Sequence, residues 1–216
     1  MKNIKKTISA IMAAAVIFGT FSVPVSADKL KTENGILYRY DDSSALVGKY
    51  TGWAKYKDGT RRYFLDGYYV TGEMPVGKSV CTFDENGALT EKKSAQITVT
   101  ADVPIHSGDT FIPMTIKLLG KGCYDMVPSS KFERWEKGEW VDCLGEGIEY
   151  VTCDCLYTLD NVGFFDNRFD DEEKTDFSPE EYMGTKLTAG YYRLTFGADG
   201  VGSDGFTVYA IIKVTD

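Results

Sequence analysis

The chain has 216 residues and a formal net charge of −8, with 24 Lys and Arg against 32 Asp and Glu. Such an acidic balance repels phosphate backbones and anionic lipid, which argues against nucleic acid as a partner and against electrostatic docking on a membrane. The single histidine, His106, excludes zinc sites built from several histidines, and a Ser-His-carboxylate triad would have to include it. We therefore expect a non-catalytic protein without a resident metal or cofactor.

The N-terminus has the pattern of an export signal. Met1–Lys6 is basic, Ile8–Val23 is apolar and uncharged, and Pro24–Ala27 ends in small residues that suit cleavage after Ala27. A short membrane anchor is the alternative, but the apolar stretch is marginal against the roughly 20 residues that a span needs. We expect residues 1–27 to be a signal peptide and the mature protein to be secreted or cell-wall associated, without membrane contact after signal cleavage.

The rest of the chain is predicted to be all-β, in two segments of different composition. Residues 34–90 are rich in tyrosine and glycine and have very short apolar runs, whereas residues 97–216 contain longer alternating runs of strand length. The polar residues 91–96 lie between them, lack periodicity and are predicted to be a linker.

Residues 34–90 repeat with a period of about 20 residues. One copy runs from Thr51-Gly52-Trp53 to Arg62-Tyr63-Phe64, and the next runs from Thr71-Gly72-Glu73 to Cys81-Thr82-Phe83. Each copy reads as a small hairpin with an Asp/Asn-Gly turn. A hairpin of this size cannot bury its own apolar face, so we expect neighbouring copies to stack.

The best copy, Gly52-Trp53-x4-Asp58-Gly59-x3-Tyr63-Phe64-x2-Gly67-x3-Thr71-Gly72, resembles the cell-wall-binding repeat of secreted bacterial surface proteins, the glucan-binding and choline-binding family. The resemblance implies short β-hairpins with shallow aromatic sites for choline or sugar. It assigns ligand binding to Trp53, Tyr63 and Phe64. The implied partner is a cell-wall polysaccharide or a teichoic-acid-type polymer.

The chain departs from the family pattern at two positions. Glu73 stands where the next tryptophan is expected, and Thr82 stands near an expected aromatic position. A cage built from two tryptophans is therefore incomplete. The alternative interpretation is that the aromatic residues of this segment only pack the hairpins together.

Seven strands are predicted in the second segment, which fits a two-sheet sandwich. They cover Ile97–Val103, Thr110–Leu118, Lys131–Trp135, Glu139–Leu144, Glu149–Leu156, Tyr191–Phe196 and Phe206–Val214. A two-residue Lys137-Gly138 turn would place Trp135 opposite Trp140, either in the sandwich core or as a carbohydrate platform. Proline after a capping serine predicts one helical turn in Ser178–Met183.

This second segment resembles a bacterial Ig-like domain of secreted Gram-positive proteins. The likeness rests on ERWEKGEWVD at 133–142, on Leu187–Leu194, and on the closing strand YAIIKVTD at 209–216. Ala189 stands where proline is common in the family. The resemblance implies an immunoglobulin-like β-sandwich over 97–216 that acts as a spacer or adhesion module, with another surface protein as a further partner.

Two other patterns are interpreted without a ligand. Gly200–Gly205 spells the dinucleotide fingerprint G-x-G-x-x-G, but a strand follows it rather than a helix, so we predict a hairpin loop. The acidic residues of 166–176 match no ordered calcium pattern and are predicted to form a solvated loop. The alternative function, a small secreted hydrolase, would use carboxylates of the 160–180 loop.

Five cysteines leave at least one thiol that cannot pair within the chain. Export permits disulfides, so one bridge can form within Cys123, Cys143, Cys153 and Cys155, although buried free thiols are the competing interpretation. Cys81 lies apart from these four and is our choice for the unpaired thiol. No Cys-x2-Cys pair points to zinc, and His106 is expected to be an exposed loop residue.

Overall fold

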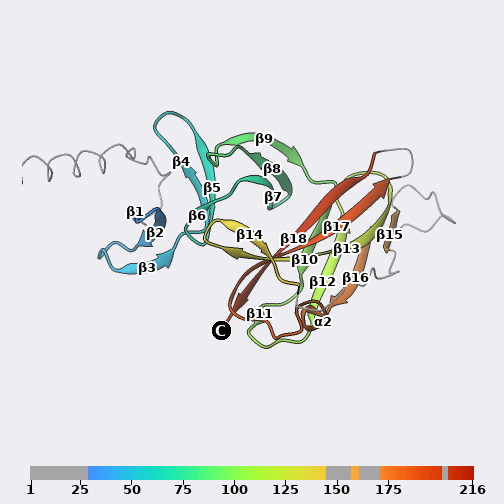
Figure 1. The fold of residues 1–216 in the computed structure, drawn as a ribbon. Helices are drawn as coiled ribbons and strands as arrows, with labels where there is room; N and C mark the ends of the chain where they lie inside the picture. Colours follow the sequence, from blue (N-terminus) through green and yellow to red (C-terminus); the bar gives the residue numbers. More distant parts are fainter. Residues whose placement is uncertain (1–28, 145–156, 161–170, 201–203) are drawn as a thin grey trace, which may run out of the picture. The chain divides into compact units, whose positions relative to one another are not determined.

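The computed structural model describes residues 29–144, 157–160, 171–200 and 204–216 (Figure 1). The predicted signal peptide, residues 1–27, and the predicted strand Glu149–Leu156 lie outside the described residues. Within the described ranges every regular element is a β-strand except the short helix α2, Pro179–Met183. The predicted all-β fold is therefore confirmed.

The chain divides into two compact units. The first contains the described part of Met1–Gly72 together with Phe83–Thr90, and the second contains Glu73–Thr82 together with Glu91–Asp216. Residues 73–82 of the last repeat copy thus group with residues 91–216, whereas the sequence pattern placed all of residues 34–90 in one segment.

Residues 29–94 form three sheets of three short strands each. The strands are β1 Lys29–Glu33, β2 Ile36–Tyr40 and β3 Leu46–Lys49; β4 Gly52–Lys55, β5 Arg61–Leu65 and β6 Tyr68–Tyr69; and β7 Gly72–Val76, β8 Ser79–Phe83 and β9 Leu89–Ser94. Neighbouring strands in the first two sheets are antiparallel. The predicted linker differs from the structure, because residues 91–94 continue β9, an edge strand whose exposed side chains give no apolar alternation.

A turn glycine brings the first two hairpins of the first unit together. The N–H of Gly67 donates to the carbonyl of Tyr50, and the carbonyl of Gly67 accepts the N–H of Leu37, each at 2.8 Å. A Cβ on Gly67, which has φ +83°, would lie 2.5 Å from the side chain of Ile36. Only glycine permits this approach and this backbone angle together. In the next copy a Cβ on Gly87 would collide with the ring of Tyr69. The stacking expected from the repeat is thus present.

The repeat is also visible in two turns that share the same hydrogen bonds. The carboxylate of Asp41 accepts the N–H of Ala45 at 2.8 Å, and the carboxylate of Asp84 accepts the N–H of Ala88 at 2.8 Å. In both turns the aspartate N–H also donates back to the alanine carbonyl. The turns at Asp41–Ala45 and Asp84–Ala88 therefore repeat the same hydrogen bonds.

The second unit contains a sandwich of two sheets. One sheet has the order β10 Ile97–Ala101, β12 Ile112–Leu118 and β16 Glu172–Phe177; the other has the order β11 Ile105–His106, β18 Phe206–Thr215, β17 Gly190–Gly200, β13 Cys123–Glu136 and β14 Glu139–Asp142, with β15 Tyr157–Asp160 also paired to β13. Strand β10 pairs with β12 in the first sheet, and the following strand β11 runs parallel to β18 in the second sheet. This strand order is that of an immunoglobulin-like sandwich.

The core lies between the two sheets and is built from alternate residues of their strands. On β12, Ile112, Met114 and Ile116 are at most 1% exposed. They belong to one buried apolar cluster with Phe132 of β13 and Phe177 of β16, whose ring centroids lie 5.0 Å apart. The apolar alternation of the second segment therefore does fill a sandwich core.

Strands β13 and β16 differ from the prediction, whereas the predicted helical turn is present. Strand β13 begins at Cys123, well before the predicted Lys131, and a register shift between Pro128 and Phe132 divides it. Strand β16 was not predicted, because its sequence EEKTDF is mostly charged and exposed. The part of the predicted acidic loop that falls on it is therefore an edge strand. The predicted helical turn is present as α2, but the Ser178 side chain makes no capping hydrogen bond.

The tryptophan hairpin is confirmed. Trp135 pairs with Trp140 across β13 and β14, and the connecting Lys137 and Gly138 have φ values of +51° and +99°. Positive φ at both turn residues is the signature of the two-residue turn that suits a twisted hairpin. The two indole centroids lie 4.9 Å apart.

Candidate functional site

The strongest candidate surface in the first unit is an aromatic cluster around Trp53. Trp53 of β4 pairs directly with Tyr63 of β5, and their rings meet edge to face with centroids 5.3 Å apart. Phe83 packs against Trp53 from the end of β8 at 5.8 Å. The Arg61 guanidinium lies 4.7 Å above the Trp53 ring. We call Trp53, Tyr63, Phe83 and Arg61 the Trp53 cluster.

Only two of the three predicted ligand-binding residues belong to this surface. Trp53 and Tyr63 are half-buried, whereas Phe64 is 5% exposed and packs with Leu37 and Ala54 in a small core. Tyr63 and Phe64 are adjacent on a strand, so their side chains point to opposite faces. Phe64 therefore stabilises the hairpin and is not placed to meet a ligand.

Two members of the Trp53 cluster were missed by the sequence reasoning. Phe83 follows Thr82, the position that departs from the family pattern, and supplies an aromatic ring one residue later. Arg61 is not part of any motif in the sequence. A basic residue at the start of an aromatic strand is the pattern that could have indicated it. A guanidinium over an indole face is a cation–π contact.

The chain's own cations lie over several aromatic faces in this unit. Lys49 lies 5.8 Å from the ring centroid of Tyr68, and Arg62 lies 4.6 Å from that of Tyr56. Lys49 also pairs with Asp66 at 2.7 Å, and this hydrogen bond raises its pKa. Over residues 28–72 and 83–90 the sequence has eight Lys and Arg against eight Asp and Glu, while residues 91–216 have 12 against 23. The net negative charge of the protein is thus concentrated outside the first unit, which contains the Trp53 cluster.

A second aromatic group lies on the outer face of the sandwich. Glu133 Oε2 accepts a hydrogen bond from Nε of Arg193 and forms an ion pair with its Nη2, both at 2.7 Å. The Arg193 guanidinium also lies 4.7 Å from the Trp140 ring and 5.1 Å from the Tyr209 ring. Trp135 is 7% exposed but is not part of the cluster between the sheets. The two tryptophans therefore form a packed layer on the outer face of the sandwich. They belong neither to the core between the sheets nor to an open platform.

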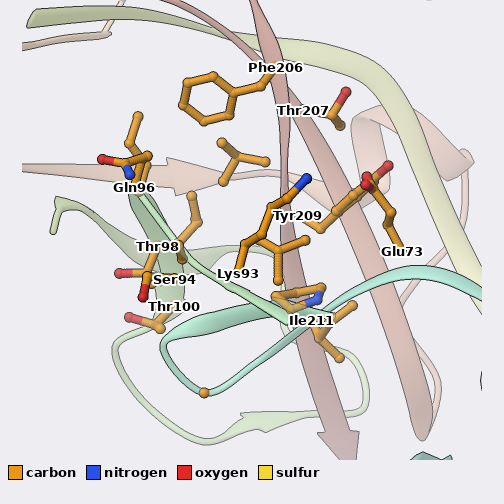
Figure 2. A pocket seen from close by; sticks show the side chains of 17 residues that line it. Glu73, Lys93, Ser94, Gln96, Thr98, Thr100, Phe206, Thr207, Tyr209 and Ile211 are labelled. Atoms are coloured by element: carbon orange, nitrogen blue, oxygen red, sulfur yellow. The ribbon is translucent and has the colours of Figure 1, made fainter. Parts of the chain in front are cut away.

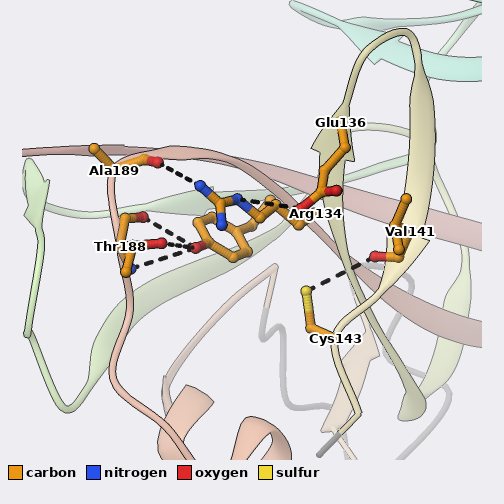
Figure 3. A network of polar contacts seen from close by, with 7 residues as sticks. Arg134, Glu136, Val141, Cys143, Thr188 and Ala189 are labelled. Carbon is orange, nitrogen blue, oxygen red and sulfur yellow. Dashed lines mark hydrogen bonds and ion pairs between the residues drawn. The ribbon is translucent and has the colours of Figure 1, made fainter.

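The motif around Leu187–Leu194 forms a polar network at the entry to β17 (Figure 3). The Tyr192 hydroxyl donates to the backbone carbonyl of Thr188 at 3.0 Å. Arg134 Nη2 donates to the carbonyl of Ala189 at 3.0 Å, and its guanidinium lies 5.8 Å from the Tyr192 ring. A buried tyrosine that bonds back to the preceding turn is a hallmark of immunoglobulin-like sandwiches. This network is structural.

The second unit also contains a pocket of about 750 Å³ (Figure 2). Its walls come from β7, β8 and β9 on one side and from β10 and β18 on the other. The side chains of Lys93, Thr98 and Tyr209 converge on it. No pattern in the sequence indicated this pocket, because it is lined by strands far apart in the chain.

The described cysteines lie in separate places. Cys123 begins β13, whereas the N–H of Cys143 bonds the carbonyl of Phe132 toward the other end of that strand. Both are free thiols, and burial raises the pKa of Cys143 to about 11. Cys81 is buried on β8. Cys153 and Cys155 lie outside the described residues, so the predicted bridge stays a prediction.

The remaining sequence candidates have local structural roles. His106 is exposed at the end of β11, where its Nδ1 lies 3.1 Å from the Thr215 hydroxyl. Residues 201–203 of the Gly200–Gly205 motif lie outside the described residues, and the strands on either side of it, β17 and β18, are antiparallel. Of the described carboxylates in 160–180, Glu172 lies on β16 and pairs with Lys117 at 3.0 Å. Residues 161–170 of that predicted loop lie outside the described residues.

Within the described residues, His, Cys, Asp and Glu side chains form no group of three that could hold a metal ion. In the same part of the chain no helix has the length and apolar composition needed to cross a membrane. A scan against models of known protein families found no match, and no curated protein matches the chain. The function must therefore be argued from the surfaces described above.

Proposed function

We propose that this is a secreted, non-catalytic surface protein that attaches to cell-wall polymer through the Trp53 cluster. The observation that carries this proposal is the half-buried cross-strand pair of Trp53 and Tyr63, backed by Phe83. Aromatic rings held rigidly at a surface offer a large contact area at low entropic cost. The immunoglobulin-like sandwich then acts as a spacer or adhesion module, with another surface protein as a further partner.

Arg61 narrows the chemistry of the polymer. Its guanidinium lies over the Trp53 ring, so a quaternary ammonium such as choline would have to displace it from that face. A sugar or polyol can instead pack against the ring edges, while an anionic group pairs with the guanidinium. A wall polysaccharide, or a teichoic-acid-type polymer that carries phosphate, therefore fits the cluster better than free choline.

A retention assay tests this proposal. Residues 28–216 are incubated with isolated Gram-positive cell wall, and the bound fraction is compared with that of a Trp53→Ala/Tyr63→Ala variant. The matched control is Phe111→Ala, which removes an aromatic side chain that is 57% exposed in the second unit. We expect retention to fall for the double variant and to persist for the control. Equal retention of all three proteins would contradict the proposal.

The double variant removes rings that also pack, so its folding has to be checked by circular dichroism. Arg61→Gln provides a second test, because Arg61 is exposed and its loss leaves the three rings in place. For an anionic polymer we expect weaker retention of Arg61→Gln and a loss of retention at high salt. Salt-independent retention would indicate a neutral glycan.

A further inference from the structure

The pocket of the second unit has one wall rich in hydroxyl groups. On β10, Thr98 and Thr100 alternate with residues of the sandwich core, and on the neighbouring β18 Thr207 and Tyr209 do the same. Because successive side chains of a strand point to opposite faces, these four hydroxyls are presented on the outer side, where the pocket lies. Each hydroxyl can both donate and accept a hydrogen bond.

Apolar side chains also line the pocket. Pro75 of β7 and Val80 of β8 are half-buried and line the pocket from the hairpin side, and Ile211 extends the apolar surface on β18. The pocket therefore combines a row of hydrogen-bonding groups with an aliphatic face. A pyranose ring has the matching two-sided chemistry, with hydroxyls around its edge and C–H groups on its face.

The charges at the pocket balance. Glu73 and Lys93 both line it and are exposed, and Lys93 also pairs with Glu91 at 2.9 Å. One carboxylate and one ammonium give no net attraction for an anion or a cation, but each can bond a neutral hydroxyl. The volume of about 750 Å³ lies within the range of pockets that enclose small ligands.

We propose that this pocket binds a short, neutral oligosaccharide, with the Thr98, Thr100, Thr207 and Tyr209 hydroxyls on the sugar edge and Pro75 and Val80 on its face. This inference does not rest on the attachment proposed for the Trp53 cluster, because all lining residues belong to the second unit. It gives the sandwich unit a recognition role of its own.

The test is a titration of isotope-labelled residues 28–216 with maltotriose and, separately, with triacetylchitotriose, followed by amide chemical shifts. We expect shifts that saturate and that concentrate on β10 and on the Thr207–Ile211 part of β18. The isosteric double variant Thr98→Val/Thr207→Val removes two hydroxyls and keeps the β-branched shape. It should weaken binding about tenfold or more, since each hydroxyl supplies a modest net hydrogen bond.

Two controls make the outcome decisive. Thr32→Val makes the same change on an exposed strand of the first unit and should leave binding unaltered. Val80→Trp fills the pocket from the hairpin side, keeps every hydroxyl and should abolish binding. The proposal is overturned if neither trisaccharide shifts the pocket residues at millimolar concentration. It is equally overturned if only an apolar probe such as anilinonaphthalene sulfonate binds, or if the double variant binds as well as the parent.

The same variants separate this pocket from the Trp53 cluster. Thr98→Val/Thr207→Val should keep the retention on isolated cell wall that Trp53→Ala/Tyr63→Ala loses. Conversely, the Trp53 double variant should still bind the trisaccharide in solution. Each proposal can therefore fail while the other stands.

Discussion

The rings of Phe132 and Tyr192 stack almost parallel across β13 and β17, with centroids 5.2 Å apart and 9° between their planes. The stack buries Tyr192 to 2% exposure and so fixes where its hydroxyl can point. That hydroxyl bonds the carbonyl of Thr188 in the turn before β17. One side chain thus joins the packing of the core to the geometry of the strand entry.

Removing this hydroxyl should lower the stability of the sandwich. Tyr192→Phe keeps the ring stack but leaves the Thr188 carbonyl without its partner, so we expect a loss of about 1–2 kcal/mol in the free energy of unfolding. Urea denaturation followed by fluorescence measures it. Tyr124→Phe, whose ring packs edge to face on Phe206, is the matched control and should change stability by less than about 0.5 kcal/mol. Equal effects of the two substitutions would argue against a special role for the Thr188 contact.

The tryptophan hairpin carries a residue that its turn does not favour. Lys137 has φ +51°, a left-handed conformation that asparagine adopts at lower cost than lysine. Lys137→Asn is therefore expected to stabilise the protein by about 0.5–1 kcal/mol. Thermal unfolding should show a raised midpoint, whereas Gly138→Val in the same turn should lower it. A lowered midpoint for Lys137→Asn would mean that the Lys137 side chain has a stabilising role.

Removing one partner of the Glu133–Arg193 pair is predicted to destabilise the protein strongly, whereas replacing both partners with apolar residues is predicted to have little effect on stability. The side chain of Glu133 is 4% exposed, so Arg193→Met leaves a buried carboxylate whose remaining ion pair in the described residues is with Lys131, at 3.2 Å. We expect a destabilisation of about 3 kcal/mol. Glu133→Leu combined with Arg193→Met removes the unpaired charge and should recover most of that loss. A double variant that is no more stable than Arg193→Met would show that the pair acts through the Trp140 and Tyr209 rings instead.

Cys143 should react slowly with thiol reagents at neutral pH. Burial raises its pKa to about 11, so the reactive thiolate is about two orders of magnitude scarcer at pH 8 than for an ordinary cysteine. Iodoacetamide labelling resolved by peptide mass should show a rate that keeps rising up to pH 11. Because folding favours the neutral thiol, Cys143 contributes to the free energy of unfolding below the ordinary cysteine pKa. This contribution is lost as the pH rises through 11. Rapid labelling at pH 7 would contradict the raised pKa of this half-buried thiol.

The repeated turns predict a stabilising glycine. Ser44 occupies a left-handed position, φ +65°, that Gly87 fills with φ +74° in the matching turn. Ser44→Gly relieves the backbone cost of a side chain there, partly offset by the greater freedom of glycine in the unfolded chain. A net gain of about 0.5 kcal/mol is expected in denaturant unfolding of the first unit. The reverse substitution, Gly87→Ser, should be strongly destabilising, because it also collides with the ring of Tyr69.

Local patterns in the sequence predicted local structure well. The Lys137-Gly138 dipeptide sets the register of Trp135 against Trp140, and the residues around Gly190 set the entry to β17, because turn chemistry acts over a few residues. The placement of Phe64 could also have been predicted, since adjacent residues of a strand cannot share a face.

Other features depend on contacts that no local pattern encodes. The acidic β16 is a strand because its backbone pairs with β12, and its side chains carry no apolar alternation. The grouping of Glu73–Thr82 with the sandwich, and the pocket that this hairpin lines, arise from packing between segments far apart in the chain.

The position of β18 has a consequence for how the protein is made. It is the last strand of the sandwich in chain order, yet it lies inside its sheet, between β11 and β17. The contact of Thr215 with the carbonyl of Ile105 joins residues 110 positions apart. The edge strand β11 cannot pair with its sheet early during synthesis, because loop closure over such a distance waits for β18 itself. Strand β17 pairs with β13 on one side and with β18 on the other, so the sandwich keeps one open strand edge until β18 has been made.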